Sequence, residues 1–245
     1  MDVALFSPSS LFGEDDDHDD DKLQHSPGVG TSNNSKSVMF VERSHSFPGM
    51  NLLVREFSFH HLNANLLWPG SLSFAQWLVQ HGTYLNGCRI IELGSGTGAL
   101  AIFLAKLLQV DITTSDFDDG DIEENIAHNC RANGLPVLPH IRHSWGDRFP
   151  CEEPNWNLII ANDILLYVKQ YPNLVKTLSF LLKSYKPKDD KSSGTEVQLP
   201  KPSFLMSWKR RIGREDESLF FSCCEACGLK VEHLGSRIYC INLTC

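Results

Sequence analysis

The sequence lacks the long apolar runs of a membrane protein and the leader of a secreted one. None of its apolar runs approaches the roughly 18–20 residues that a membrane-spanning helix needs. The N-terminal region is rich in Ser and Asp and contains no basic, apolar signal segment. We therefore expect a protein that neither spans a membrane nor is secreted, and that is located in the cytoplasm or the nucleus.

Clusters of basic residues are lacking as well. The 245 residues carry a formal net charge of −8, and much of this charge comes from acidic residues in the first 22 positions. The rest of the chain is close to neutral and has no basic stripe of the kind that binds nucleic acid. We expect no nucleic-acid partner, and the length favours one main domain, which we expect to be monomeric.

A second Cys-x-x-Cys pair, which zinc sites usually require, is also missing. The eight cysteines include the single pair Cys224 and Cys227. Together with Phe220 and Cys223 this pair follows the spacing of one helix face. Buried cysteine behaves as a small hydrophobic residue, so we expect free thiols packed in the core and no metal site.

Composition divides the chain into a tail and a domain. Residues 1–37 contain few large apolar residues and are predicted to form a disordered acidic tail. The remainder, residues 38–245, is predicted to be one domain. Within it, residues 38–67 alternate in the manner of a β-meander, and residues 184–202 have the Lys, Ser, Pro and Gly content of a flexible surface loop.

From residue 71 onward, helical periods and short apolar runs alternate. Helices are predicted at residues 71–80, 99–108, 119–133, 172–182 and 216–227, and strands at 88–93, 110–115, 137–144, 158–161, 203–208, 229–234 and 238–243. This order predicts an α/β fold of the Rossmann-like kind, with a mostly parallel seven-stranded sheet covered by helices on both faces. The last two strands are expected to form an antiparallel hairpin around Gly235.

The most informative segment joins the first strand of that alternation to its helix. It reads Ile90-Ile-Glu-Leu-Gly-Ser-Gly-Thr-Gly98, so a buried strand is followed by three glycines at alternate positions. Glycine permits positive φ and lets a ligand approach the backbone closely. The helix that follows offers unpaired N–H groups to that ligand. The segment therefore predicts the cofactor seat of an open α/β sheet.

The glycine turn alone leaves two cofactors open. Gly94-x-Gly96-x-x-Ala99 fits the loose fingerprint for NAD. Glu92 would oppose a pyrophosphate, however, and suits a cationic, amino-acid-like ligand such as S-adenosylmethionine. Asp116 follows Gly96 by 20 residues, at the expected end of the next strand, where it can accept both ribose hydroxyls of either cofactor. Its alternative reading is a loop acid or a helix cap.

Five blocks, in this order along the chain, resemble one known family. That family is family 16 of the S-adenosylmethionine-dependent methyltransferases, the methyltransferase-like-21 group of protein-lysine methyltransferases. The blocks are Leu67-Trp-Pro-Gly70, Glu92-Leu-Gly-Ser-Gly-Thr-Gly98, Thr113-Thr-Ser-Asp116, His143-Ser-Trp-Gly146 and Asn157–Tyr167. The resemblance implies a class I methyltransferase fold, S-adenosylmethionine as cofactor and a protein substrate. The implied reaction is N-methylation of a lysine side chain in a non-histone protein.

The resemblance also implies which residues form the site. Asp163 and Tyr167 would be catalytic, with Asp163 orienting the amine. The cofactor would be bound by Trp68, Glu92, Gly94, Ser95, Gly96, Gly98, Asp116, Trp145 and Asn162. Each tryptophan has an alternative reading as core packing, and Asp163 has one as an acid that fixes the loop after its strand.

Two positions depart from the family pattern. The family places an aromatic residue three positions after the acid, where this chain has Leu166, and Tyr167 follows one position later. Asn162 stands where the family usually has a small residue. These departures keep two alternatives open. One is a cofactor-binding scaffold with impaired catalysis, and the other is a small-molecule methyltransferase of the same fold.

Overall fold

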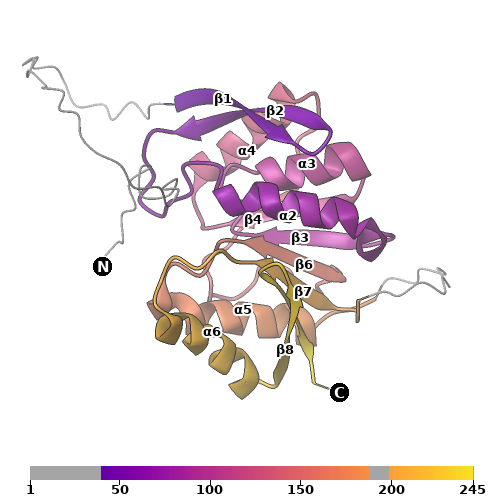
Figure 1. Ribbon diagram of the computed structural model, residues 1–245, viewed down its shortest axis with the longest axis vertical. Helices are drawn as coiled ribbons and strands as arrows, with labels where there is room; N and C mark the ends of the chain where they lie inside the picture. The colour runs from indigo at the N-terminus through magenta and orange to yellow at the C-terminus, as the bar shows by residue number, and fades with distance from the viewer. Residues whose placement is uncertain (1–39, 188–198, 245) are drawn as a thin grey trace, which may run out of the picture.

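The computed structural model describes residues 40–187 and 199–244 and shows a seven-stranded sheet between two layers of helices (Figure 1). The tail predicted for residues 1–37 lies outside the described residues, as does most of the loop predicted for 184–202. The strands are β1 (Phe40–Phe47), β2 (Met50–Phe57), β3 (Arg89–Leu93), β4 (Asp111–Asp116), β5 (His140–Arg142), β6 (Leu158–Asn162), β7 (Ser203–Ser207), β8 (Leu229–Gly235) and β9 (Ile238–Leu243). The helices are α2 (Pro69–Gln80), α3 (Ala99–Leu108), α4 (Gly120–Ala132), α5 (Tyr171–Lys183) and α6 (Arg214–Ala226), with short 3-10 turns η1 (Gly82–Leu85) and η2 (Val168–Gln170).

The strand order of the large sheet is β5-β4-β3-β6-β7-β9-β8. Neighbouring strands run parallel from β5 to β7, whereas β9 runs antiparallel to both β7 and β8. The Rossmann-like α/β fold with a C-terminal antiparallel hairpin is thereby confirmed. Within the described ranges, no helix has the length and apolar character needed to cross a lipid bilayer.

Adjacent residues of the central strands face opposite helix layers. Ile90 and Ile160 pack with α2, α3 and α4, whereas Ile91 and Ile159 pack with α5 and α6. Figure 1 shows α2 and α3 on one side of the sheet and α5 and α6 on the other. A strand that is covered on both faces needs such a continuous apolar run. Because β3, β4 and β6 are parallel neighbours, their carboxyl ends lie at one edge of the sheet, where ligands bind in open α/β folds.

The N-terminal segment forms two strands and not the β-meander that the sequence predicted. They make one hairpin, β1 with β2, that is a two-stranded sheet of its own. Residues 58–67 contain no described strand, and Ala64, Leu66 and Leu67 within them are buried. Asn63 adopts a left-handed φ of 57°, which an extended strand cannot contain.

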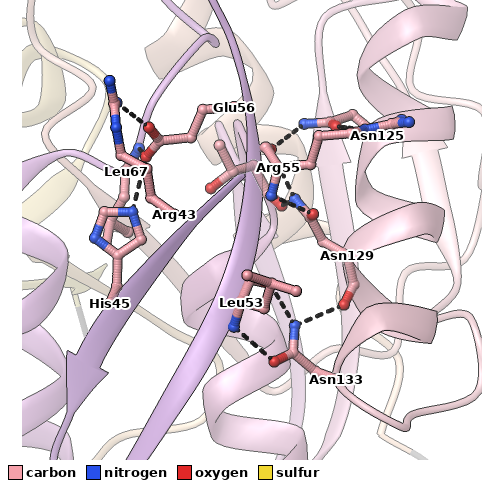
Figure 2. Close-up of polar contacts among 10 residues, drawn as sticks. Arg43, His45, Leu53, Arg55, Glu56, Leu67, Asn125, Asn129 and Asn133 are labelled. Carbon is pink, nitrogen blue, oxygen red and sulfur yellow. Dashed lines mark hydrogen bonds and ion pairs between the residues drawn. The ribbon is translucent and has the colours of Figure 1, made fainter. Parts of the chain in front are cut away.

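Two asparagines on one face of α4, Asn125 and Asn129, and its C-cap residue Asn133 bind the hairpin (Figure 2). The Asn133 side chain accepts from the Leu53 N–H at 3.0 Å and donates to the Leu53 carbonyl at 2.7 Å. Asn129 binds the N–H and carbonyl of Arg55 at 2.7 and 3.1 Å, and Asn125 donates to the same carbonyl. Helix residues four apart rise by about 6 Å and strand residues two apart by about 6.6 Å, so the two spacings match.

The cysteine-bearing helix α6 is only partly buried along the predicted face. Phe220 and Cys224 are fully buried, and Cys223 is half-buried against the core. Cys227 is exposed, which corrects its assignment to the core. The reason is that α6 ends at Ala226, so Cys227 lies beyond the last turn.

Glu56 connects the hairpin to the segment that precedes α2. Its carboxylate is buried, pairs with Arg43 and His45, and accepts from the Leu67 N–H at 3.0 Å (Figure 2). Burial acts to raise the pKa of this carboxyl, but the hydrogen bonds with His45 and Leu67 and the nearby charges outweigh it and hold the pKa below its ordinary value of 4.5.

We expect Glu56→Gln to lower the free energy of unfolding by about 1–3 kcal/mol at neutral pH. Because the folded-state pKa is lowered, Glu56 stabilises the fold above its unfolded pKa and loses this effect as the pH falls through the folded value. Urea unfolding of both proteins at acidic and neutral pH measures the difference, which should narrow on acidification. A gap that stays constant with pH would show that the charge of Glu56 is not involved. Glu42→Gln, at an exposed carboxylate of β1, is the control.

Candidate functional site

A cavity of about 410 Å³ opens at the carboxyl ends of β3, β4 and β6. It brings together nearly every site residue that the sequence predicts. The predicted residues that line it are Trp68, Glu92, Gly94, Ser95, Gly96, Asp116, Trp145, Asn162, Asp163 and Tyr167. Gly98 is the exception, since it forms the N-cap of α3 and faces α4 instead. The roles of these residues in binding and catalysis stay predictions.

All three glycines of the turn have a positive φ, and at two of them a side chain would also collide with a neighbour. Gly94 has a φ of 70°, and a Cβ there would lie 2.8 Å from Cγ2 of Ile164. Gly98 has a φ of 74°, and its Cβ would lie 2.9 Å from Cγ2 of Ile126. A Cβ on Gly96 would meet nothing within 4 Å and would occupy open space instead. The turn therefore leaves room beside its backbone for a ligand.

The carboxyl group of Glu92 lines this cavity and lacks a full set of hydrogen-bond partners. The residue is 3% exposed, and among the described residues its Oε2 has no hydrogen-bond partner. Burial raises the pKa of Glu92 to about 8. A buried acceptor without a partner costs free energy unless a ligand satisfies it. A cationic amino group in the cavity would supply both the donor and the opposite charge.

Asp116 ends the strand next to β3 and supports the glycine turn. Its Oδ2 accepts from the Gly96 N–H at 2.7 Å and its Oδ1 from the Phe117 N–H at 2.7 Å. Burial raises the pKa of this carboxyl despite these two hydrogen bonds. Each carboxylate oxygen keeps a second lone pair, so Asp116 can accept further bonds from a ligand hydroxyl.

The mouth of the cavity is lined by aromatic side chains that one loop residue connects. Asn63 accepts a hydrogen bond at its carbonyl from Trp68 Nε1 at 3.0 Å. Its side-chain amide donates to the Tyr167 hydroxyl at 2.7 Å. Tyr167 therefore lies at the cavity even though it comes one position later than the family pattern, and Leu166 lines the same cavity.

Asp163 is fully engaged by three donors. Its Oδ1 accepts from the Lys209 N–H at 2.9 Å, and its Oδ2 accepts from the Gly70 N–H at 3.2 Å and from Arg211 Nη2 at 2.8 Å. The carboxylate and the guanidinium are both buried, with side-chain exposures of 0% and 9%. Arg211 also lies 5.0 Å from the centre of the Trp68 ring. Asp163 thus binds the start of α2 and the segment after β7 together.

Asn162 contributes to the same junction. In the orientation that satisfies both ends of its amide, the oxygen accepts from the Ser71 N–H at 3.1 Å and from the Ser71 hydroxyl at 2.9 Å, and the nitrogen donates to the Gly70 carbonyl at 3.3 Å. A Cβ on Gly70 would lie 2.4 Å from Oδ2 of Asp163. The Pro69-Gly70 step is therefore set by close packing against the end of β6.

Two residues of this site have no counterpart in the sequence predictions. Asn63 and Arg211 lie outside every motif, and each acts on predicted residues through a contact between distant segments. The left-handed tendency of asparagine is a weak signal for Asn63. The Lys209-Arg-Arg211 run gives no sign of which arginine is buried.

Beside the cavity, His60, His61 and Asp119 bring potential metal-ligand atoms within 4.8 Å of one another. Their hydrogen bonds oppose ligation. The Leu62 N–H donates to Nδ1 of His60 at 3.2 Å, so in the neutral ring the proton is on Nε2, which faces Asp119 at 3.4 Å. A metal ion at Nε2 would move that proton to Nδ1, where it would meet the Leu62 N–H.

Comparison with known proteins decides the family. The model of a family described as lysine methyltransferase matches residues 50–226, which is most of the chain. The chain belongs to this family. The resemblance inferred from the five sequence blocks is thereby confirmed.

Curated relatives share about a quarter to a third of their aligned residues with the chain. EEF1A lysine methyltransferase 3 of Xenopus tropicalis is 29% identical over 59% of this chain and 65% of the relative. Protein N-lysine methyltransferase METTL21A of the same species is 29% identical over 48% and 55%. Histone-arginine methyltransferase METTL23 of Xenopus laevis is 26% identical over 47% and 50%. The matches thus span between half and just under two thirds of these relatives' lengths.

Solved structures share the fold. The 16S rRNA N2 G1207 methyltransferase RsmC of T. Thermophilus has a TM-score of 0.56 and 17% identity, covering 85% of this chain and 51% of that one. The CcbJ methyltransferase of Streptomyces caelestis has a TM-score of 0.54 and 9% identity, covering 72% and 90%. At such identities the likeness extends to the fold alone.

Glu92 makes the stability of the protein pH-dependent in a direction that can be measured. Its folded pKa of about 8 is above the ordinary 4.5, so its stabilising protonated form is present at low pH and is lost as the pH rises through 8. Glu92→Gln removes this loss. We expect the free energy of unfolding of the variant to exceed that of the native protein by about 2–5 kcal/mol at pH 9, and by less at pH 5. Thermal unfolding across this range, with the exposed Glu153→Gln as control, measures it; parallel curves would contradict it.

Asp163→Asn should destabilise the protein by about 3–5 kcal/mol, because it leaves the Arg211 guanidinium buried without its counter-charge. Asparagine tolerates the left-handed φ of 52° at this position, so the substitution changes charge rather than backbone. Asp111→Asn, at an exposed ion pair with Arg89, should cost less than about 1 kcal/mol. Equal effects in urea unfolding would show that the Asp163 pair is not buried in solution.

Proposed function

We propose that the protein is an S-adenosylmethionine-dependent methyltransferase that N-methylates a lysine side chain of a protein. The observation that carries the proposal is the unpartnered carboxylate oxygen of Glu92 beside the glycine turn, with Asp116 on the neighbouring strand. One acid suits the cationic amino group of the cofactor and the other its ribose hydroxyls. Membership of the lysine methyltransferase family supports the choice of substrate residue.

The residues present fit the cofactor. The backbone of Gly94 to Gly96 would pack against its amino-acid part, and Trp145 lies within reach of the turn, since a Cβ on Gly94 would be 3.9 Å from its ring. S-adenosylmethionine supplies a methyl group on a positively charged sulfur. Its transfer is an in-line displacement, so the chain contributes chiefly by placing the acceptor.

A lysine acceptor must lose its proton before it reacts, since its ordinary pKa is near 10.4. Partial burial beside Trp68 and Tyr167, which line the cavity, favours this loss because burial lowers the pKa of an amine. The aromatic faces attract the charged form, so they aid its capture and not its deprotonation. Asp163 cannot be a free base here, since three donors engage it. Because it is paired with Arg211, Asp163 is not an isolated negative charge that would hold the ammonium form.

Within this proposal Asp163 acts by position. It fixes Gly70, and through Arg211 it fixes the Trp68 ring. A hydrogen bond from Asn63 holds the Tyr167 hydroxyl in place. Burial raises the pKa of this hydroxyl, so Tyr167 takes part in the reaction as a neutral phenol. The hydroxyl oxygen can then accept from an N–H of the incoming amine, which leaves the nitrogen lone pair free to react, and its O–H can donate to a water.

Methyl-labelled S-adenosylmethionine with the purified protein and a cell lysate tests the proposal. We expect a discrete labelled protein band whose hydrolysate contains N-methyl-lysine. Asp116→Ala should weaken cofactor binding by about 1.5–3 kcal/mol, because charge-assisted bonds to the ribose are lost. Asp111→Ala, at the opposite end of β4, should leave binding unchanged.

The other outcomes identify the alternatives. Cofactor binding by calorimetry without labelled protein or metabolite would indicate the scaffold. Labelled metabolites without labelled protein would indicate a small-molecule methyltransferase. Label recovered on arginine would keep the fold and cofactor and overturn the lysine assignment.

A further inference from the structure

The glycine turn is supported from outside the sheet by helix α4. Ile126 of this helix fills the space against Gly98, and Asn129 donates a hydrogen bond from its side chain to the Thr97 carbonyl at 2.9 Å. Thr97 lines the cavity together with Gly96. Asn129 is 0% exposed and therefore contacts the wall of the cavity from behind, within the protein interior.

Asn129 uses both N–H groups of its amide for different segments. One donates to the Arg55 carbonyl of β2 at 3.1 Å and the other to Thr97 in the turn. Its oxygen accepts from the Arg55 N–H at 2.7 Å, a bond that Figure 2 shows. A single planar group thus joins the N-terminal hairpin to the cofactor turn.

We propose that Asn129 is a positioning residue for cofactor binding, and that through it the β1–β2 hairpin is part of the cofactor site. The inference rests on the proposed function in taking S-adenosylmethionine as the ligand of the turn. A turn built of three glycines has many accessible conformations. Each contact that restricts it before binding reduces the entropy that the ligand must offset.

The hairpin also reaches the other wall of the cavity. Glu56 accepts from the Leu67 N–H, next to Trp68, from the strand that Asn129 binds. The chain between β2 and α2 is therefore anchored at Glu56, while the turn is anchored at Asn129. Displacement of β2 would disturb both walls together.

Asn133 provides a matched comparison one helical turn away. Like Asn129, it bonds the N–H and the carbonyl of one β2 residue, in this case Leu53. Its second N–H donates to the Asn129 carbonyl of its own helix at 2.8 Å. The two asparagines therefore differ in whether the remaining donor reaches the cofactor turn.

The experiment compares Asn129→Ala with Asn133→Ala in the full chain. Both should lower the melting temperature, because Asn129→Ala removes the bonds to the Arg55 N–H and the Thr97 carbonyl, and Asn133→Ala removes the bonds to the N–H and carbonyl of Leu53. Calorimetry with S-adenosylmethionine should show affinity reduced about tenfold or more by Asn129→Ala and changed by less than about twofold by Asn133→Ala. Hydrogen exchange over residues 94–98 should quicken in the first variant alone. Equal effects of the two variants on both readouts would overturn the proposal.

Thermodynamic reciprocity gives a second test on the native protein. If the turn and the hairpin are coupled, the cofactor should slow hydrogen exchange in β2, and Asn129→Ala should abolish that protection. Protection that persists in the variant would contradict the coupling.

Should the alanine variants fail to fold, Asn129→Ser and Asn133→Ser allow the same comparison with a smaller void. A native protein that does not bind S-adenosylmethionine would refute the proposed function, while exchange over residues 94–98 would still decide the role of Asn129.

Discussion

The structure depends on holding a turn that has almost no side chains of its own. Between β3 and α3 the chain offers glycine at three of five positions, which leaves space for a ligand but few contacts to fix the backbone. The contacts come from neighbours instead. Ser115 accepts from the N–H groups of Gly94 and Ser95 at 2.8 and 3.1 Å, and Asp116 accepts from Gly96. Three separate segments, namely β4, α4 and the residues after β6, contact a turn that the sequence presents as a local motif.

The same logic explains why the acids of this edge differ so much in environment. Glu92 is buried, one of its oxygens has no hydrogen-bond partner, and its pKa is raised to about 8. It can therefore accept a hydrogen bond from a ligand. Asp163 is equally buried but has three donors, one of which is its ion-pair partner Arg211, so it is already satisfied. A buried carboxylate without partners indicates a missing ligand, whereas one with a full set indicates a structural junction. On this criterion Glu92 has the environment expected of a ligand-binding acid, whereas Asp163 has that of an acid that holds the end of β6 to the start of α2.

Prediction from sequence succeeded where the signal was local. The boundaries of α3 match the predicted residues because a glycine turn and an apolar period define them. Helix α4 begins after its N-cap Asp119, close to the start that the acidic first turn predicted. The Tyr167 position could not be predicted in the same way. It depends on a hydrogen bond from Asn63, 104 residues away in sequence. The Asp163–Arg211 pair likewise joins the ends of two strands, and nothing in either segment alone specifies it.

The asparagines of α4 show a signal that hydrophobic periodicity overlooks. Ile122, Ile126 and Cys130 give the helix one buried apolar stripe, and Asn125, Asn129 and Asn133 give it a second stripe that is just as buried. Burying a primary amide is unfavourable unless its donors and acceptor are all satisfied, and a bare helix surface cannot satisfy them. The outer edge of a strand can, because it presents N–H and carbonyl groups at nearly the spacing of successive helical turns. A stripe of asparagine at every fourth residue beside an apolar stripe therefore predicts that a strand docks along the helix, and here that strand is β2.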